Sequence, residues 1–361
     1  MQIAILGLPG VGKTTIFNAA TAGEIEVGLF NEKTNLGVAK VHDSRLDILD
    51  EYFQPKRKIQ AEISYVDFPS QQEGQSKIQG ITGENLNLLQ KSDALLLVIK
   101  AFNGPMDIDE NYFGDPVTEL HALMDEIIFV DLGIIENRVN KIQENSKGRN
   151  VSKLDQEKVE LDLLTKIKSS LEKGFPLETI VYTESELKLL SGFQLLTLKP
   201  MVIVLNIGET NINNGSNLEG LIRENFDIEI GTICGKLEMD LIGTSIDEEQ
   251  QLREVLGLSQ ESGLHRMVNL CFNSLKLISF LTVGEDEVRA WPITKGTVSS
   301  VAAGKIHSDI QRGFIRAEVI SYENLEACKT IAEARKKGLL RVEGKDYVVQ
   351  DGDIMHVLFN V

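Results

Sequence analysis

Apolar residues form short continuous runs in the first two thirds of the chain, and stretches compatible with helices separate them. Such runs are typical of strands that are buried on both faces of a parallel sheet. We predict strands at residues 3–6, 63–67, 94–99 and 200–206. Strands that alternate with helices are joined by right-handed crossovers. The pattern therefore predicts an α/β fold with a doubly wound, mostly parallel sheet.

Between residues 132 and 196 the chain is charged, poor in glycine and nearly free of strand-like runs. Apolar residues recur there at helical spacing, with Lys and Glu between them: Val159, Leu161, Leu163, Leu164, Ile167 and Leu171. Turn-forming residues at 145–150 interrupt the pattern. We predict an antiparallel helical hairpin inserted into the sheet domain. Solvation accounts for its charged faces, and a partner-binding surface is the alternative.

Near residue 280 the pattern changes again. Strand-like runs at 280–283, 288–291, 315–319 and 354–359 surround one helix-compatible segment at 325–337. Strands and a helix in so short a stretch predict a small α+β domain. The predicted parts are a sheet domain at 1–131 and 197–278, a helical insertion at 132–196, and the small domain at 279–361.

Composition adds limits on partners and location. The 361 residues carry a net charge of −17, so the protein as a whole is not a polyanion binder, although Arg335-Lys336-Lys337 could form a local basic patch. The three cysteines (Cys234, Cys271 and Cys328) form no C-x-x-C pair, which favours reduced thiols. No apolar run reaches membrane-spanning length, and the chain start lacks a signal-peptide pattern. We expect a cytoplasmic protein without a leader.

The most informative stretch is Gly7-Leu8-Pro9-Gly10-Val11-Gly12-Lys13-Thr14, which reads G-x-x-x-x-G-K-T between a predicted strand and a predicted helix. Glycines let backbone N–H groups point at phosphate oxygens, and a helix N-terminus favours anions. Lys13 should contact the β- and γ-phosphates, and the Thr14 hydroxyl should bind Mg²⁺. Lys13 is thus the first catalytic candidate. The expected nucleotide-binding residues here are Gly10, Val11, Gly12, Lys13, Thr14 and Thr15.

A phosphate loop needs further metal-binding and catalytic parts. Thr34, in a polar stretch, is placed to supply a second Mg²⁺ ligand, and an ordinary loop threonine is the alternative. Asp67 ends an apolar strand and should hold Mg²⁺ through water. Ser70 stands where a glycine usually contacts the γ-phosphate. Gln71 follows where many GTPases orient the attacking water, so it is a second, weaker catalytic candidate.

Base recognition should come from the end of the strand at 200–206. GTPases use N-K-x-D there, and the aspartate accepts hydrogen bonds from guanine N1 and N2. This chain has Asn206-Ile207-Gly208-Glu209, so Ile207 replaces the lysine and Glu209 the aspartate. Poor guanine discrimination follows, and adenine becomes plausible. Cys234-Gly235-Lys236 occupies the place of a later base-contacting loop.

Together these residues resemble the YchF-type Obg-like ATPases, a branch of the translation-factor-related P-loop NTPases. The resemblance covers almost the whole chain. It implies a G domain, a helical insertion and a C-terminal β-grasp domain of the TGS type. It also implies a preference for ATP over GTP, dependence on Mg²⁺, and association with ribosomes, with the large subunit as the expected contact. The most specific matching stretches are residues 7–9, 43–47, 55–57, 206–209, 287–291, 302–309, 313–319 and 344–353.

The chain departs from this family at several positions. Family members carry Asn in place of Gly10, and D-x-A-G followed by a hydrophobic residue where this chain has Asp67-Phe68-Pro69-Ser70-Gln71. Three residues are missing after Thr34. Asp109 stands in the place of a loop histidine that is thought to assist hydrolysis, and His121 lies further on in a predicted helix. Phosphate and magnesium binding should therefore be retained, while turnover should be slow or altered.

Three functional hypotheses remain open. The first is a weak ATPase switch at the ribosome, in which the γ-phosphate orders the loops at Thr34 and 70–74. The second is an Obg-class GTPase, and the third is a nucleotide-binding regulatory module without hydrolysis. A metabolic kinase is less favoured, because no motif for a second substrate is evident.

Ribosome contact follows from the resemblance alone, and neither a membrane nor DNA is expected as a partner. Strand-surface charges without a partner, or alternatively a local basic patch, are expected at Lys305, His307, Arg312 and Arg316.

Overall fold

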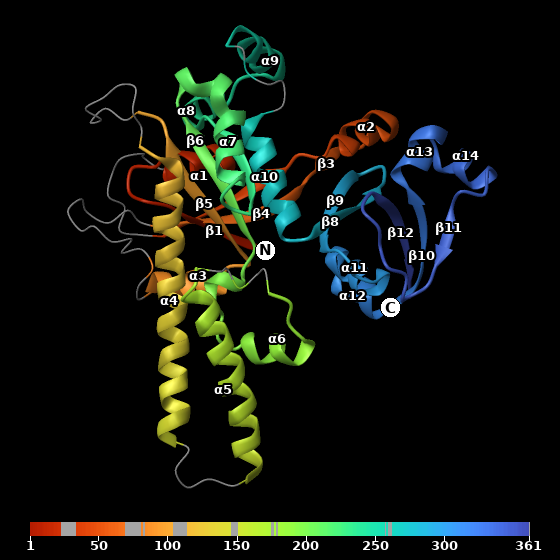
Figure 1. Ribbon diagram of the computed structural model, residues 1–361. Helices are drawn as coiled ribbons and strands as arrows, with labels where there is room; N and C mark the ends of the chain where they lie inside the picture. Colours follow the sequence, from red (N-terminus) through yellow and green to blue (C-terminus); the bar gives the residue numbers. More distant parts are fainter. Residues whose placement is uncertain are drawn as a thin grey trace. The chain divides into compact units, whose positions relative to one another are not determined.

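The computed structural model describes residues 1–22, 34–68, 81, 84–103, 114–145, 151–174, 177, 180–256, 258 and 262–360. Its helices and strands are labelled in Figure 1. The chain divides into two compact units. The first comprises Met1–Gly37 with Ser64–Met267, and the second comprises Val38–Ile63 with Val268–Val361. In these ranges no helix is long and apolar enough to cross a membrane.

The first unit is built on a six-stranded sheet in the order β2-β4-β1-β5-β6-β7. All four pairings from β4 through to β7 are parallel, as the continuous apolar runs predict. The doubly wound α/β fold is thereby confirmed. The strands are β1 (Gln2–Leu6), β2 (Asn35–Val41), β4 (Ala61–Asp67), β5 (Ala94–Ala101), β6 (Met201–Ile207) and β7 (Glu229–Ile233).

Helices of the first unit pack on this sheet. Helix α4 contacts β5, α7 contacts β6 and β7, and α1 contacts β1 and α8. Alternate strand residues such as Leu95 and Leu97 share a core with Leu120 and Leu123 of α4. The helices are α1 (Lys13–Thr21), α3 (Glu84–Lys91), α4 (Pro116–Asn145), α7 (Gly215–Arg223), α8 (Gly235–Asp240), α9 (Ile246–Val255) and α10 (Gly263–Ser274), the last continuing into the second unit.

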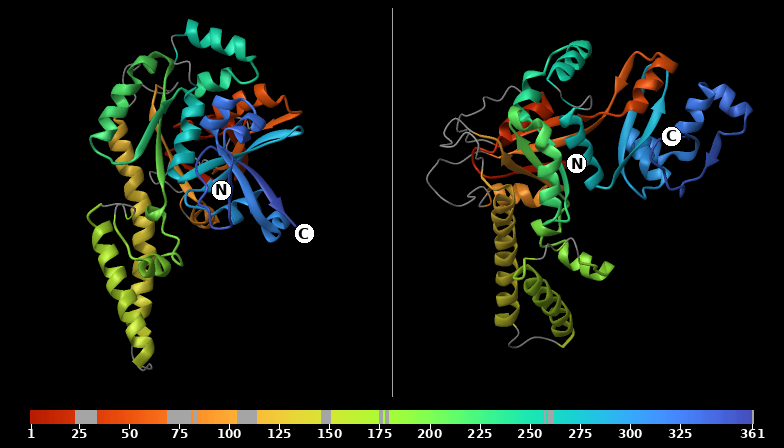
Figure 2. Two further views of the ribbon diagram at one scale, coloured as in Figure 1. Left: turned by 90° about the vertical axis from the view of Figure 1, so that its right-hand side faces the viewer. Right: turned by 45° about the horizontal axis from the view of Figure 1, so that its top comes forward.

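A helical arm projects from this unit. It consists of residues 128–145 of α4 together with α5 (Val151–Leu171) and α6 (Glu184–Leu190), and α4 and α5 lie side by side in Figures 1 and 2. The predicted helical hairpin is present, but α4 begins at Pro116. The predicted domain boundary at 131/132 therefore falls inside a continuous helix, and it stays a prediction. The arm has its own apolar core, which includes Ile128, Ile135, Ile142, Leu164, Ile167 and Leu171.

The second unit contains a mixed six-stranded sheet in the order β11-β10-β12-β8-β9-β3. Strand β12 runs parallel to β8, and β8–β9, β10–β12 and β10–β11 are antiparallel. This is the β-grasp arrangement that the resemblance implies. The strands are β3 (Arg57–Ile59), β8 (Leu277–Val283), β9 (Glu287–Thr294), β10 (Phe314–Ser321), β11 (Arg341–Glu343) and β12 (Asp353–Phe359).

The helices of the second unit correct one prediction. The single helix expected at 325–337 is wrong, because Lys329 adopts a left-handed φ of 62° and ends the first of two short helices. Thr330 then caps the second helix through its hydroxyl, which accepts a hydrogen bond from the N–H of Glu333. The helices are α2 (Ser44–Phe53), α11 (Ser299–Ile306), α12 (Ser308–Arg312), α13 (Tyr322–Cys328) and α14 (Ile331–Lys336).

Candidate functional site

The phosphate loop connects the end of β1 at Leu6 to the start of α1 at Lys13. Two of its glycines are required by close approach. A Cβ on Gly7 would collide with the carbonyl oxygen of Val98 in β5, and a Cβ on Gly12 would collide with the side-chain amide of Asn206. Gly12 also has a φ of 91°, which L-residues rarely adopt. The loop therefore packs closely against Val98 of β5 and Asn206 of β6.

Asn206 fixes the loop from the end of β6. Its Nδ2 donates a hydrogen bond to the carbonyl oxygen of Val11 at 2.9 Å, and its Oδ1 accepts one from the backbone N–H of Gly235 at 3.0 Å. The side chain is 5% exposed. It therefore joins the phosphate loop to the start of α8, where the sequence predicts a base-contacting loop.

Lys13 lies over the loop that precedes it. Its Nζ donates hydrogen bonds to the carbonyl oxygens of Gly7 and Leu8, at 3.0 and 2.9 Å. Burial lowers the pKa of Lys13, while the negative charges of Asp67 and Glu119 oppose this shift. The lysine is thus held in place by neutral carbonyls, which an anionic ligand could replace as stronger acceptors.

Thr14 and Asp67 meet at the carboxyl end of the sheet. The Thr14 hydroxyl donates a hydrogen bond to Asp67 Oδ2 at 3.0 Å. Asp67 is 1% exposed, and its Oδ1 has no hydrogen-bond partner among the described residues. Burial raises the pKa of Asp67, opposed by the hydrogen bond from Thr14 and the charge of Lys13. The structure therefore brings together Lys13, Thr14 and Asp67.

Of the remaining predicted metal-binding and catalytic residues, the structure describes Thr34 but not Gln71. Thr34 lies directly before β2. Burial raises the pKa of Asp67, and Asn35, the neighbour of Thr34, is one of the groups that oppose this shift. Ser70, Gln71 and Asp109 lie outside the described residues.

The predicted base-contacting residues have different surroundings. Ile207 is buried in the core of the first unit. Glu209 Oε1 lies 2.7 Å from Lys236 Nζ, and both side chains are largely exposed. The hydrogen bond with Glu209 raises the pKa of Lys236. This ion pair joins the segment that follows β6 to the first turn of α8, and the sequence predicts both to lie near the base.

One charged group near the phosphate loop was not predicted. Glu119, in the first turn of α4, accepts a hydrogen bond from the backbone N–H of Lys100 at 3.2 Å. Burial raises the pKa of Glu119, while the charges of Lys100 and Lys13 oppose this shift. The sequence offers no signal for it, since a glutamate in the first turn of a helix is common.

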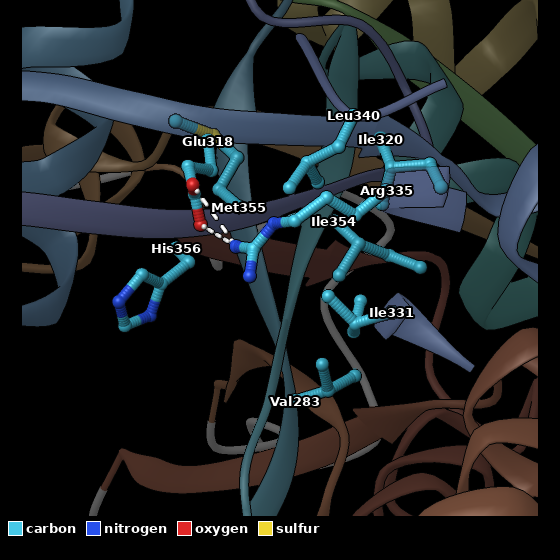
Figure 3. A pocket seen from close by; sticks show the side chains of 9 residues that line it. All are labelled: Val283, Glu318, Ile320, Ile331, Arg335, Leu340, Ile354, Met355 and His356. Carbon is cyan, nitrogen blue, oxygen red and sulfur yellow. Dashed lines mark hydrogen bonds and ion pairs between the residues drawn. The ribbon is translucent and has the colours of Figure 1, made fainter. Parts of the chain in front are cut away.

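The second unit has a separate cavity of about 250 Å³, shown in Figure 3. Its Glu318 and Arg335 side chains form an ion pair with N–O distances of 3.0 and 3.1 Å. These charges satisfy each other, so the cavity offers less free bonding capacity than the phosphate loop. The lining residues are Val283, Glu318, Ile320, Ile331, Arg335, Leu340, Ile354, Met355 and His356.

Two family models match the chain. One, described as "50S ribosome-binding GTPase", matches residues 2–130, and the YchF-GTPase_C model, described as "Protein of unknown function (DUF933)", matches residues 277–360. Two relatives named "Ribosome-binding ATPase YchF", from Mycoplasma genitalium and Bacillus subtilis, are each 35% identical over 100% of both chains. The chain belongs to the YchF family.

Solved structures agree with this assignment to the YchF family. The structure of the Schizosaccharomyces pombe YchF GTPase superposes with a TM-score of 0.86 at 28% identity, covering 99% of this chain and 97% of that one. A GTP-binding protein from Pyrococcus horikoshii, 21% identical with a TM-score of 0.60, shares the fold. The resemblance and the fold class predicted from the sequence are both confirmed. The roles of the individual site residues stay predictions.

Proposed function

We propose that this YchF-family chain binds ATP with Mg²⁺, hydrolyses it slowly, and acts as a conformational switch that associates with the ribosome through the large subunit. The observation that carries the proposal is the group of Lys13, Thr14 and Asp67 at the phosphate loop, with bonding capacity left over. Two relatives carry the name "Ribosome-binding ATPase YchF". That name supports ATP as the nucleotide and the ribosome as the partner.

The residues present fit a magnesium ion. Mg²⁺ prefers oxygen ligands, and phosphate sites typically supply it with only one or two protein oxygens. Asp67 Oδ1 is buried without a hydrogen-bond partner among the described residues, and the Thr14 hydroxyl lies beside the same carboxylate. Thr14 and Thr34 would hold the ion directly, and Asp67 through water. When bound, the ion would neutralise charge on the phosphate oxygens.

The protein's own groups would position the triphosphate. Backbone N–H groups of Gly10 to Thr15 would donate to phosphate oxygens at the N-terminus of α1. Lys13 would exchange its hydrogen bonds with the Gly7 and Leu8 carbonyls for bonds to the β- and γ-phosphates. Because the hydrogen bonds of Asn206 already fix the loop, little reorganisation is needed on binding.

ATP is favoured over GTP by the state of Glu209. Its carboxylate is engaged by Lys236 at 2.7 Å, so it is a poorer acceptor for guanine N–H groups than a free aspartate. GTP is the second candidate, because the family model matching residues 2–130 describes a GTPase.

Titration calorimetry with ATP, GTP and their diphosphates, with and without Mg²⁺, tests the binding. We expect wild type to bind ATP more tightly than GTP, and Lys13→Ala to lose measurable ATP binding. Lys91→Ala, an exposed lysine on α3, is the matched control and should bind as wild type does. Unchanged ATP affinity in Lys13→Ala would overturn the site assignment.

Hydrolysis and ribosome association need separate measurements. A single-turnover assay should show slow ATP hydrolysis, and cosedimentation should show binding to 50S subunits that depends on the nucleotide. Tight ATP binding without any turnover would instead support a regulatory module. Equal sedimentation with and without ribosomes would remove the ribosome from the proposal.

A further inference from the structure

The second unit contains a further cavity, of about 460 Å³, that takes no part in the proposed nucleotide binding. Its walls come from the loop that leads from β2 into α2, from the end of α10 with the start of β8, and from Asp351 before β12, all within the second unit. Two of these segments, 43–47 and 344–353, are among the stretches that match the YchF family most specifically. Ligand sites typically measure about 300–1,000 Å³, so the cavity is large enough to admit a ligand.

One part of the lining is a fixed group of charges around Arg45. Its guanidinium donates hydrogen bonds to Asp43 from Nε at 2.9 Å and to Asp351 from Nη1 at 2.8 Å. Asp351 also accepts a hydrogen bond from the backbone N–H of Ser279 at 2.9 Å, yet its side chain is 51% exposed. With His42 neutral, two carboxylates and one guanidinium give the lining a net charge of −1. The cavity therefore attracts cations and repels anions.

Another part of the lining carries two side-chain amides that are available to a ligand. Asn269 and Asn273 lie one turn apart on α10, so they share a face of the helix, and both line the cavity. Asn269 is half-buried and Asn273 is exposed. Neither amide forms a hydrogen bond within the part of the chain that the structure describes. Each can offer an acceptor oxygen and two N–H donors.

The spacing of the two asparagines matches that of an extended polypeptide. Four residues advance roughly 6.0 Å along an α-helix, and two residues advance roughly 6.4–6.8 Å along an extended chain. Each amide can therefore accept from a backbone N–H and donate to a backbone C=O at alternate residues of a bound segment. Side chains at every second position of such a segment share one direction, so cations at alternate positions can together face the carboxylates of Asp43 and Asp351.

We propose that this cavity binds an extended, lysine- or arginine-containing polypeptide segment, with Asn269 and Asn273 holding its backbone and Asp43 and Asp351 facing its cations. A peptide is favoured over an RNA strand, since phosphates would meet a lining of net negative charge on a protein whose net charge is −17. Peptide binding needs no nucleotide, so the inference goes beyond the proposed function and does not depend on it.

Fluorescence anisotropy with three labelled octamers tests the chemistry of the partner. The first is a peptide that alternates lysine and serine, the second replaces each lysine by glutamate, and the third is an octamer of adenylate RNA. We expect wild type to bind the lysine peptide, more weakly as salt is raised, and to bind neither of the other two. The absence of binding to the lysine peptide, or equally tight binding of the glutamate peptide or the RNA, would overturn the proposal.

The double variant Asn269→Ala/Asn273→Ala tests recognition of the backbone. Alanine favours a helix more than asparagine does, so α10 should stay intact. We expect the lysine peptide to bind at least about fivefold more weakly, because two hydrogen-bonding groups are lost. Asn324→Ala, which removes an exposed asparagine of α13 in the same unit, is the matched control and should leave peptide affinity within about twofold of wild type. Equal affinity in wild type and the double variant would reduce binding to general attraction between opposite charges and contradict the proposal.

A measurement on wild type alone decides the question if the double variant does not fold. The side-chain amide NMR signals of Asn269 and Asn273 should shift when the lysine peptide is added, whereas the signal of Asn324 should not. Unshifted signals of both cavity asparagines with peptide bound would overturn the proposal. These experiments contain no nucleotide, so their failure is distinguishable from a failure of ATP binding.

Discussion

Two groups of buried charge in the first unit differ in how fully their hydrogen-bonding capacity is used. In one, Glu238 of α8 accepts hydrogen bonds from Arg253, the Ser262 hydroxyl and the Gly263 N–H, each at 2.9 Å. Arg253 also donates to Glu249 at 2.8 Å. This cluster is complete, and it joins α8, α9 and the start of α10.

The group at the phosphate loop is incomplete by comparison. Lys13 is held by two main-chain carbonyls, and Asp67 Oδ1 has no hydrogen-bond partner within the described ranges. Buried polar groups are normally satisfied, so unused capacity next to shifted pKa values indicates a ligand site. The difference teaches that buried charge alone does not distinguish the two groups, whereas unused hydrogen-bonding capacity does.

The largest expected effect comes from breaking the complete cluster. Arg253 is 3% exposed, and Arg253→Met would leave the Glu238 carboxylate buried without its cation. We expect a loss of about 3–5 kcal/mol in the free energy of unfolding, measured by urea denaturation. ATP affinity, measured by calorimetry on the folded variant, should not change, since this cluster supplies no ligand contact.

Two variants sharpen that result. Arg138→Met removes an arginine of the arm whose side chain is 43% exposed and pairs with Glu160, so it should cost at most about 1 kcal/mol. Adding Glu238→Gln to Arg253→Met should restore part of the lost stability, because the unpaired charge is removed. Equal losses for Arg253→Met and Arg138→Met would contradict the distinction between the two groups.

The next effect in size comes from the incomplete group. Asp67→Asn keeps the volume of the side chain and an acceptor for Thr14, but it removes the carboxylate charge. We expect the Mg²⁺ concentration needed for tight ATP binding to rise about 10- to 100-fold, the usual consequence of losing a carboxylate that orients a metal's ligands. Calorimetry over a series of Mg²⁺ concentrations measures this directly.

The same variant should change how stability depends on pH. Burial raises the pKa of Asp67 above its usual value of 3.8, so the folded protein binds this proton more readily than the unfolded chain does. The wild-type free energy of unfolding therefore falls as pH rises from about 3.8 through the folded-state pKa, and this contribution is constant above it. Asp67→Asn should lack that fall. If the wild-type and variant curves stay parallel across this window, the pKa of Asp67 is not raised in the folded protein.

The continuous apolar runs sufficed to predict the four central strands, since buried parallel strands need apolar side chains on both faces. They did not reveal β2 or β7, whose side chains are mixed in polarity. The three-residue β3 is too short for any pattern. Its pairing with β9 brings residues 38–63 into the second unit, which no local feature indicates.

The residues of the candidate site also fall into two classes, those that the sequence predicts and those that it does not. Gly12, Lys13 and Thr14 form a local motif whose spacing reflects the geometry of phosphate binding, so the sequence was enough to propose them. Glu119 and the Glu238–Arg253 pair are single charged residues on helices. They become informative only when the fold is known, which places Glu119 against the Lys100 backbone of β5 and Glu238 next to Arg253. A pattern along the chain cannot report such proximity.

The smallest expected effect concerns a third arrangement, an exposed ion pair at the edge of the site. Glu209 and Lys236 are bonded to each other, yet the sequence predicts both to lie near the base. Glu209→Asp shortens the acid, weakens its reach to Lys236, and restores the residue that guanine-specific proteins use. We expect GTP affinity to rise about three- to tenfold relative to ATP, as one additional hydrogen bond would allow, with no change in melting temperature.

Lys236→Ala separates the two causes, because it frees Glu209 without shortening it. A gain of GTP affinity in both variants would mean that engagement by Lys236 disfavours guanine, whereas a gain in Glu209→Asp alone would assign the effect to side-chain length. An unchanged ratio of ATP to GTP affinity in both variants would show that the exposed Glu209–Lys236 pair does not contribute to nucleotide binding. It would then resemble the buried Glu238–Arg253 pair in this respect.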